Sequence, residues 1–179
     1  MGRPRAFDRE AALETAMRLF WELGYEQTSI SDLTRELGIS APSLYAAFGN
    51  KQTLFTEAVA RYEAKPESIT TAGIAGTSQR EVLHVMFDCA SREYAGDAHP
   101  RGCLVNSAPE LVRNRTDNRA ITAARLREVA GDIDGSGEAE ALAAFAQVLL
   151  VGLSSYARDG ANEEQLRQVA ELALRVVQA

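Results

Sequence analysis

A single glycine, Gly38, separates two short segments whose apolar residues recur at helical spacing, residues 29–37 and 40–48. The two segments would share one apolar interior, formed by Ile30, Leu33, Leu37, Ile39, Leu44 and Ala47. Because glycine adopts left-handed backbone angles without strain, Gly38 allows two helices to cross steeply after a very short connection. This pattern restricts the first third of the chain to a tight pair of crossed helices.

Capping residues mark where each of these two helices begins. Ser29 and Asp32 have the spacing of a capping box, which predicts a helix from about Ser29 to Leu37. Ser40 is a suitable N-cap, and Pro42 follows in the first turn, where a missing N–H has no cost. Two short helices joined by a tight turn are typical of the motif that places its second helix in the major groove of DNA.

Two longer helices are expected on either side of this pair. The first lies between Asp8 as N-cap and Gly24 as C-terminal stop, with Leu13, Ala16, Met17 and Phe20 on one face. The other opens at Asn50 and carries Leu54, Phe55, Ala58, Val59 and Tyr62 on one stripe. We therefore expect residues 1–62 to form a DNA-binding domain of helix-turn-helix type, in which this further helix follows the first three.

The net charge of −6 argues at first against a nucleic-acid partner, because phosphate binding needs clustered Lys and Arg. Residues 1–62 hold seven basic and eight acidic residues, yet no acid lies between Glu36 and Glu57. Lys51 is the one cation of that window, and the chain's start, before Asp8, has Arg3 and Arg5 without an acid. DNA would approach at these two acid-free windows, and the N-terminal arm is as consistent with a simple tail as with a DNA contact.

The stretches 24–34 (Gly-Tyr-Glu-Gln-Thr-Ser-Ile-Ser-Asp-Leu-Thr) and 37–55, from Leu-Gly-Ile-Ser to Gln-Thr-Leu-Phe, resemble the N-terminal domain of TetR (tetracycline-repressor-like) regulators. The resemblance covers roughly residues 6–62. It implies an all-helical protein with a DNA-binding head and a larger domain that dimerises and holds a ligand. It further implies phosphate contacts by Thr28, Tyr45 and Lys51, and base-facing positions at Ser40, Ala41 and Ser43. Thr34 stands where the family often has Ala, and its hydroxyl can bond to a preceding carbonyl.

The chain changes character after Pro66, where residues 68–78 are rich in Gly, Thr and Ser and are expected to form a linker or long loop. We expect residues 63–179 to be a second, helical domain. Its predicted helices run over about 78–94, 108–115, 117–130, 138–157 and 162–177. No segment alternates apolar and polar residues between turn signals, so no strand is predicted.

The last two predicted helices have more apolar surface than one domain can cover. In the first, Leu142, Phe145, Leu149 and Leu153 can pack inside the domain, whereas Ala139, Ala143, Ala146 and Gly152 would admit a further helix. Such surplus favours a four-helix interface between two copies. We expect a homodimer whose interface includes Phe145, Leu149, Leu153, Val169 and Leu174.

The ligand site is the least visible feature of the sequence. Its candidates combine apolar walls with a few polar tips and are His84, Phe87, Tyr94 and Cys103, although ordinary core packing explains each of them too. Arg101 lies close to Cys103, and a cationic neighbour favours the thiolate form of a cysteine, so redox sensing stays an alternative. Residues 101–106 resemble a segment common in one branch of the TetR family, which explains Cys103 without redox chemistry.

Other functional classes find little support in the sequence. Two cysteines and two isolated histidines offer neither a disulfide framework nor a metal site, and no cofactor is expected beyond an unidentified small-molecule effector. No apolar run has the length of a signal peptide or a membrane span, so a cytoplasmic protein without a membrane partner is expected. Enzyme motifs such as a phosphate-binding loop or a nucleophile elbow are missing.

We therefore expect a regulator that is not an enzyme, most simply a repressor released from its operator by a small molecule. The alternatives are a ligand-independent DNA-binding protein and a helical-bundle enzyme.

Overall fold

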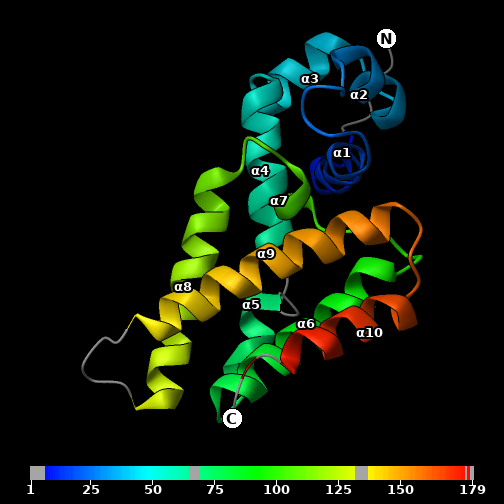
Figure 1. Cartoon of the computed structure of the whole chain (residues 1–179). Coiled ribbons are helices and arrows are strands. Elements are labelled where there is room, and N and C mark those ends of the chain that lie inside the picture. The colour runs from blue at the N-terminus through cyan, green and yellow to red at the C-terminus, as the bar shows by residue number, and fades with distance from the viewer. Residues whose placement is uncertain (1–6, 65–68, 132–136, 176, 178–179) are drawn as a thin grey trace, which may run out of the picture. The chain divides into compact units, whose positions relative to one another are not determined.

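A computed structural model describes residues 7–64, 69–131, 137–175 and 177 of the chain, and every regular element in these residues is helical (Figure 1). The chain forms two compact units, Met1–Lys65 and Pro66–Ala179, called unit 1 and unit 2 below. The predicted all-helical class is confirmed.

Unit 1 contains four helices whose starts agree with the predicted caps. They are α1 (Arg9–Leu23), α2 (Ile30–Leu37), α3 (Ala41–Phe48) and α4 (Lys51–Glu63). The side chains that accept backbone N–H groups at these four starts belong to Asp8, Ser29, Ser40 and Asn50, respectively. Each cap satisfies a donor that has no partner inside its helix, so the local sequence alone determines where these helices begin.

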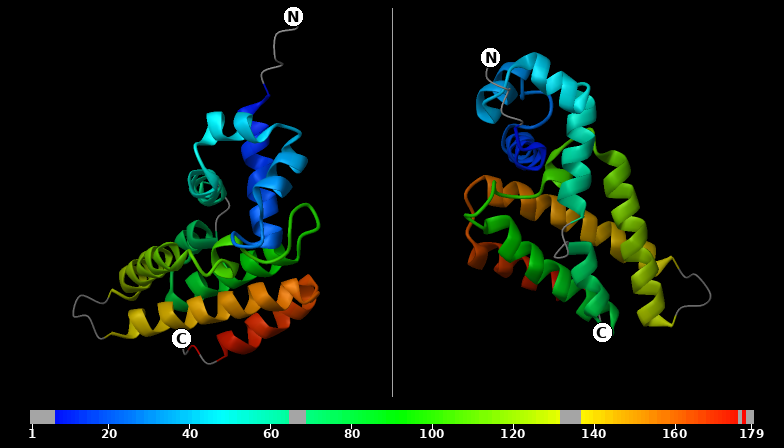
Figure 2. Two further views of the ribbon diagram at one scale, coloured as in Figure 1. Left: turned by 90° about the horizontal axis from the view of Figure 1, so that it is seen from above. Right: turned by 180° about the vertical axis from the view of Figure 1, so that it is seen from behind.

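The core of unit 1 lies where α1 packs against α4, while α2 packs on α1 and α3 lies at the start of α4 (Figure 2). The rings of Phe20 and Phe55 meet edge to face, 5.1 Å between their centroids, and both side chains are buried. Leu33 of α2 and Leu44 of α3 are fully buried as well. Burial of each such side chain stabilises the fold by about 1.5–3 kcal/mol, which fixes the two short helices on the longer pair.

Unit 2 contains α5 (Ile69–Ala72), the short 3₁₀ helix η1 (Gly73–Ala75), α6 (Gln79–Ala95), α7 (Leu104–Ser107), α8 (Val112–Ala130), α9 (Glu138–Arg158) and α10 (Glu163–Leu174). The loop predicted over 68–78 is thus partly helical. Its glycines serve close packing: a Cβ on Gly73 would lie 2.8 Å from Cγ of Met86, and one on Gly76 would collide with the backbone of Val82.

Two predicted helices, 108–115 and 117–130, are one continuous helix, α8. Thr116, which lies between the two predicted helices, is accommodated inside α8, where its hydroxyl donates to the Val112 carbonyl at 3.0 Å. The short helix α7, which was not predicted, precedes α8. The prediction of a helix boundary at this place was therefore wrong.

Helix α9 lies beside α8 at its start and packs against α6, α7 and α10 along the rest of its length (Figure 2). With 21 residues it is long and apolar enough to cross a membrane, by length and composition only. The expectation that this segment is too short for a span is therefore wrong. A core helix meets the same criterion, and the residues that α9 buries within unit 2, such as Ala143 and Leu153, are those of a helix packed on neighbours.

Candidate DNA-binding interface

The turn between α2 and α3 has the geometry that the sequence predicted. Gly38 adopts a left-handed conformation (φ 65°, ψ 28°), and its N–H donates to the last carbonyls of α2. The N–H of Ile39 donates to the Thr34 carbonyl at 3.2 Å. An L side chain at Gly38 would be strained, so this residue permits the abrupt change of direction between the two helices.

The capping box at the start of α2 is complete. The Asp32 backbone N–H donates to the Ser29 hydroxyl oxygen at 3.0 Å, and the Ser29 backbone N–H donates to the Asp32 carboxylate at 3.1 Å. The Ser29 hydroxyl donates to the same carboxylate at 2.6 Å. The Ser29 hydrogen bonds, followed by that from Arg35, lower the pKa of Asp32 from 3.8 to about 2. The ionised carboxylate therefore holds the first turn of the helix that supports α3.

The outward side of α3 is uncharged and consists of small side chains and one large aromatic. Tyr45 is 45% exposed, Pro42 and Ala46 are exposed, and Ala41 and Ser43 are partly exposed. The hydroxyls of Ser40 and Ser43 lie 2.9 Å apart, and the Ser40 oxygen also accepts the Ser43 backbone N–H. These short side chains leave the backbone of α3 open to close approach by another surface.

Lys51 is the first residue of α4, and only Asn50 separates it from Gly49 at the end of α3. Its ammonium lies 4.3 Å from the centroid of the Tyr25 ring, and that ring in turn lies 4.7 Å from the ring of Phe55. No ion pair joins Lys51 to a carboxylate within residues 7–64. Its charge is therefore not neutralised there, and the aromatic face offsets the unfavourable helix dipole.

One predicted phosphate contact is wrong. Thr28 is 0% exposed, and its hydroxyl donates to the Gly24 carbonyl at 2.7 Å. A buried hydroxyl with its proton directed inward has no donor to offer a phosphate; Thr28 closes the turn before α2 instead. The other predicted residues of the head, Ser40, Ala41, Ser43, Tyr45 and Lys51, reach the surface of one region, whereas Arg3 and Arg5 lie outside the described residues.

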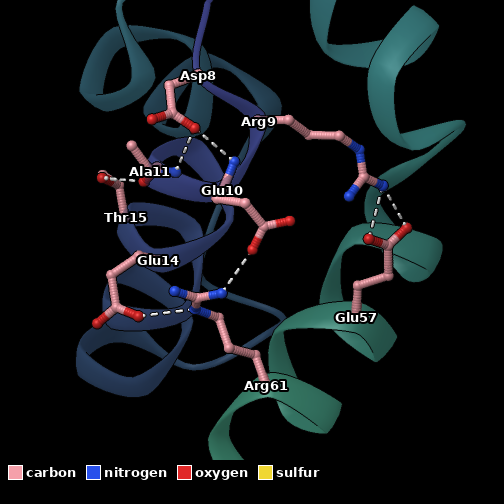
Figure 3. A network of polar contacts seen from close by, with 8 residues as sticks. All are labelled: Asp8, Arg9, Glu10, Ala11, Glu14, Thr15, Glu57 and Arg61. Atoms are coloured by element: carbon pink, nitrogen blue, oxygen red, sulfur yellow. Dashed lines mark hydrogen bonds and ion pairs between the residues drawn. The ribbon is translucent and has the colours of Figure 1, made fainter.

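Three acids of unit 1 are paired with arginines along the seam between α1 and α4 (Figure 3). Arg9 binds both carboxylate oxygens of Glu57, at 2.9 and 2.7 Å. Arg61 binds Glu10 at 2.7 Å and Glu14 at 2.9 Å. These ion pairs compensate negative charge that would otherwise repel a polyanion. The two residues of each pair are far apart in sequence, so no local signal pointed to Arg9.

Unit 2 holds the predicted ligand residues in two different settings. Phe87 and Tyr94 are buried in the interior, with the Phe87 ring 6.4 Å from that of Phe145. The Tyr94 hydroxyl accepts a hydrogen bond from Asn106 at 3.0 Å. His84 lies on the exposed side of α6. Its assignment to an interior site is wrong, because a residue three positions before Phe87 need not share its face on a helix that is packed on two sides.

Cys103 is buried at the start of α7, and its backbone N–H donates to the Ser154 hydroxyl at 2.8 Å. Arg101 hydrogen-bonds to backbone carbonyls at the ends of two helices. Its guanidinium donates to the carbonyls of Ala161 at 3.1 Å and Ala95 at 3.3 Å, near the ends of α9 and α6. Cations are favoured at helix C-termini, so the segment 100–106 is explained as a clamp between helix ends.

The outward faces of α9 and α10 expose large apolar side chains. Val148 is 73% exposed and Leu172 is 62% exposed; the others on these faces are Val151, Tyr156 and Val169. Of the predicted interface residues, Phe145 and Leu149 are partly exposed, but Leu153 and Leu174 are buried in unit 2. Assigning Leu153 and Leu174 to a surface between subunits was wrong.

The prediction of which face of α9 packs inside unit 2 was also wrong. Ala139, Ala143 and Ala146 face inward, where α6 and α8 approach closely, and Gly152 is exposed. Small side chains allow neighbouring helices to approach closely. In an almost wholly apolar helix, however, the periodicity of the sequence does not show which face packs against those neighbours.

Residues 12–58 match the model of the family described as bacterial regulatory proteins, tetR family. The chain is 34% identical to the HTH-type transcriptional repressor ComR of Escherichia coli (strain K12), with 98% of this chain and 91% of that protein covered. It is 32% identical to the HTH-type transcriptional repressor BdcR of the same organism, covering 96% and 90%.

A solved structure with the same fold is that of the TetR family transcriptional regulator CifR, a cysteine mutant complexed with 26-bp double-strand operator DNA. It is 37% identical, with a TM-score of 0.83, and the match covers 98% of this chain and 99% of that one. Identity at this level over nearly the full length of the relatives extends well beyond the DNA-binding motif. The chain belongs to the tetR family of bacterial regulatory proteins.

Proposed function

We propose that this protein is a transcriptional repressor that binds operator DNA through α3 and is released by a small molecule held in unit 2. The observation that carries the proposal is the surface formed by α3 and the start of α4. It presents uncharged, short side chains beside Tyr45 and the unneutralised Lys51. A helix with such a surface fits into a major groove, and the adjacent cation meets the phosphate backbone. Its relatives ComR and BdcR are repressors, and CifR was solved on operator DNA.

The residues of this surface have two different roles in the proposal. Tyr45 and Lys51 contact phosphates and set the position of the head, and Arg3 and Arg5 can add contacts outside the described residues. Ser40, Ala41 and Ser43 face the bases, where small side chains admit close contact with base edges and thymine methyl groups. Because the Ser43 hydroxyl lies 2.9 Å from that of Ser40, the two form one hydrogen-bonding unit toward DNA.

Binding as a homodimer follows from the apolar surfaces of α9 and α10. Val148, Val151 and Tyr156 of α9 and Val169 and Leu172 of α10 together leave more apolar area exposed than scattered surface residues would. Packing two copies along these faces gives a four-helix interface. To bind one face of the DNA, the two α3 helices of such a dimer must enter major grooves one helical turn apart, or a multiple of it, so we expect a roughly palindromic operator.

The effector site belongs in the interior of unit 2, where Phe87 and Phe145 supply apolar walls. Gln147 donates to Asn106 at 3.0 Å, and Asn106 donates to Tyr94, so a short polar chain crosses this interior. A small, mainly apolar molecule with one hydrogen-bonding group suits such walls. The molecule releases the protein from DNA only to the extent that it binds more tightly to a conformation in which the spacing of the two DNA-binding heads does not fit the operator. Binding without conversion of the effector distinguishes this role from that of an enzyme, and a cytoplasmic location follows from the DNA partner.

The test is a selection of duplexes from a random pool by the full-length protein, followed by titration of the selected duplex. The proposal predicts enrichment of a roughly palindromic sequence and loss of binding on addition of a metabolite extract. Ser43→Ala should relax the preference at one or two base pairs, whereas Lys51→Ala should weaken binding to every duplex. Enrichment without any response to extracts would indicate a ligand-independent DNA-binding protein. Failure of the folded protein to enrich any sequence would contradict the proposal.

A further inference from the structure

Arg9 is the first residue of α1, yet its side chain connects three helices of unit 1. The guanidinium binds Glu57 of α4 through both carboxylate oxygens (Figure 3). It also lies 4.6 Å from the centroid of the Phe48 ring, and its Nε donates to the Ala47 carbonyl of α3 at 3.4 Å. One side chain of α1 thus contacts both the body of α4 and the last turn of α3.

The last turn of α3 is where such a contact has the greatest effect. The final four carbonyls of a helix have no partner within it, and Ala47 supplies one of them. A cation is favoured at this end of the helix dipole, and Phe48, on which the guanidinium lies, is buried and ends α3. Arg9 therefore satisfies an unpaired carbonyl and covers the residue that holds α3 against the core.

The same contacts oppose a role for Arg9 as a phosphate contact. Two oxygens of Glu57 neutralise its charge, and a cation at the start of α1 is unfavourable unless an anion lies nearby, as Glu57 does. Its direction is set by Glu57 and Phe48 together. The side chain, 44% of which is exposed, is thus held within unit 1.

We infer that Arg9 and Glu57 are positioning residues for DNA recognition: they fix the angle and register at which α3 meets the major groove without contacting DNA. This inference rests on the proposed function, because it assigns the pair a part in DNA binding by α3. Base contacts require α3 to be held in place, so a free last turn would weaken specific binding.

The structure offers a matched control in Arg61 and Glu10. This pair also joins α4 to α1, at 2.7 Å, but neither residue has a described contact with α3 (Figure 3). Two double variants are compared with wild type, Arg9→Ala/Glu57→Ala and Arg61→Ala/Glu10→Ala. Each removes one positive and one negative charge, so the overall attraction to DNA is unchanged. Both should lose a similar small part of their thermal stability.

Fluorescence anisotropy with a duplex selected from a random pool, at several salt concentrations, gives the outcome. Arg9→Ala/Glu57→Ala should bind about five- to ten-fold more weakly, since an exposed ion pair and an exposed cation–π contact each account for up to about five-fold. Its salt dependence should equal that of wild type, and Arg61→Ala/Glu10→Ala should bind as wild type does.

The single variant Glu57→Ala gives a further test, because the two possible roles of Glu57 predict opposite changes in affinity for DNA. Loss of a negative charge strengthens binding to a polyanion if the residue has no other role, whereas the positioning account predicts weaker binding. Equal affinity of both double variants and wild type would overturn the inference. A salt slope lowered by about one unit in Arg9→Ala/Glu57→Ala would overturn it too, because it would indicate that Arg9 contacts a phosphate. If wild type itself bound no duplex, the proposed function would fail rather than this inference.

Discussion

The ammonium of Lys51 lies over the face of the Tyr25 ring, 4.3 Å from its centroid, and Tyr25 is itself fixed against Phe55. A lysine has many rotamers, and holding its cation on a fixed aromatic face reduces the entropy lost when it meets a phosphate. Tyr25 therefore prepares Lys51 for binding.

Lys51→Ala should weaken binding to all duplexes and lower the slope of log affinity against log salt by about one unit, because one phosphate contact is lost. Tyr25→Leu should weaken binding less and retain the slope, because the cation remains but is no longer held. Tyr25→Phe keeps the ring face and serves as the control that binds as wild type does. Anisotropy titrations at several salt concentrations measure all three, and an unchanged slope in Lys51→Ala would refute the phosphate contact.

Val148→Glu and Leu172→Glu should each convert the dimer to monomers. Both residues are largely exposed on the outward faces of α9 and α10, and dimerisation would bury the new carboxylate without a partner. Sedimentation velocity measures the change. Leu23→Glu is the matched control, since Leu23 is an exposed leucine of unit 1 that should leave the dimer intact. A dimer that survived both substitutions would place the interface elsewhere.

The stability of the protein should fall in acid through Asp32. Its pKa is lowered from 3.8 to about 2 by the Ser29 hydrogen bonds above all. A carboxyl whose pKa is lower in the folded state contributes stability that is fully present above pH 3.8 and is lost as the pH falls toward about 2. Denaturant titrations followed by circular dichroism should show this loss in wild type and a smaller one in Asp32→Asn and Ser29→Ala. An identical acid dependence in all three proteins would show that the capping box does not carry it.

Cys103→Ser should leave the response of DNA binding to peroxide unchanged. The thiol is buried, and the guanidinium of Arg101 is directed at helix-end carbonyls. Anisotropy before and after peroxide treatment, with wild type and Cys89→Ser alongside, measures the effect. If a response present in wild type disappeared only in Cys103→Ser, that residue would be a redox switch.

The parts of the fold that could be predicted from sequence are those fixed by local chemistry. The contacts of Ser29 with Asp32 and of Ser40 with Ser43 determine two helix starts within four residues, and Gly38 determines the turn. These features also position the surface of α3.

The incorrect predictions concern features that depend on contacts between distant parts of the chain. Thr28 could be assigned to DNA only by resemblance, and its burial depends on the packing of the turn around it. In α9, both faces are apolar, so the neighbours α6 and α8 select the alanine face. The contacts of Arg9 with Ala47 and Glu57 join residues 38 and 48 positions apart, for which a single sequence has no signal.

The most direct test of operator recognition by α3 is a footprint of the full-length protein on a duplex selected from a random pool, with the Tyr45→Ala/Lys51→Ala variant beside it. The account predicts two protected half-sites in successive major grooves, or a whole number of turns apart, on one face of the DNA, and their loss in the folded variant. Protection of a single continuous stretch without two-fold symmetry, or an unchanged footprint in the variant, would contradict it.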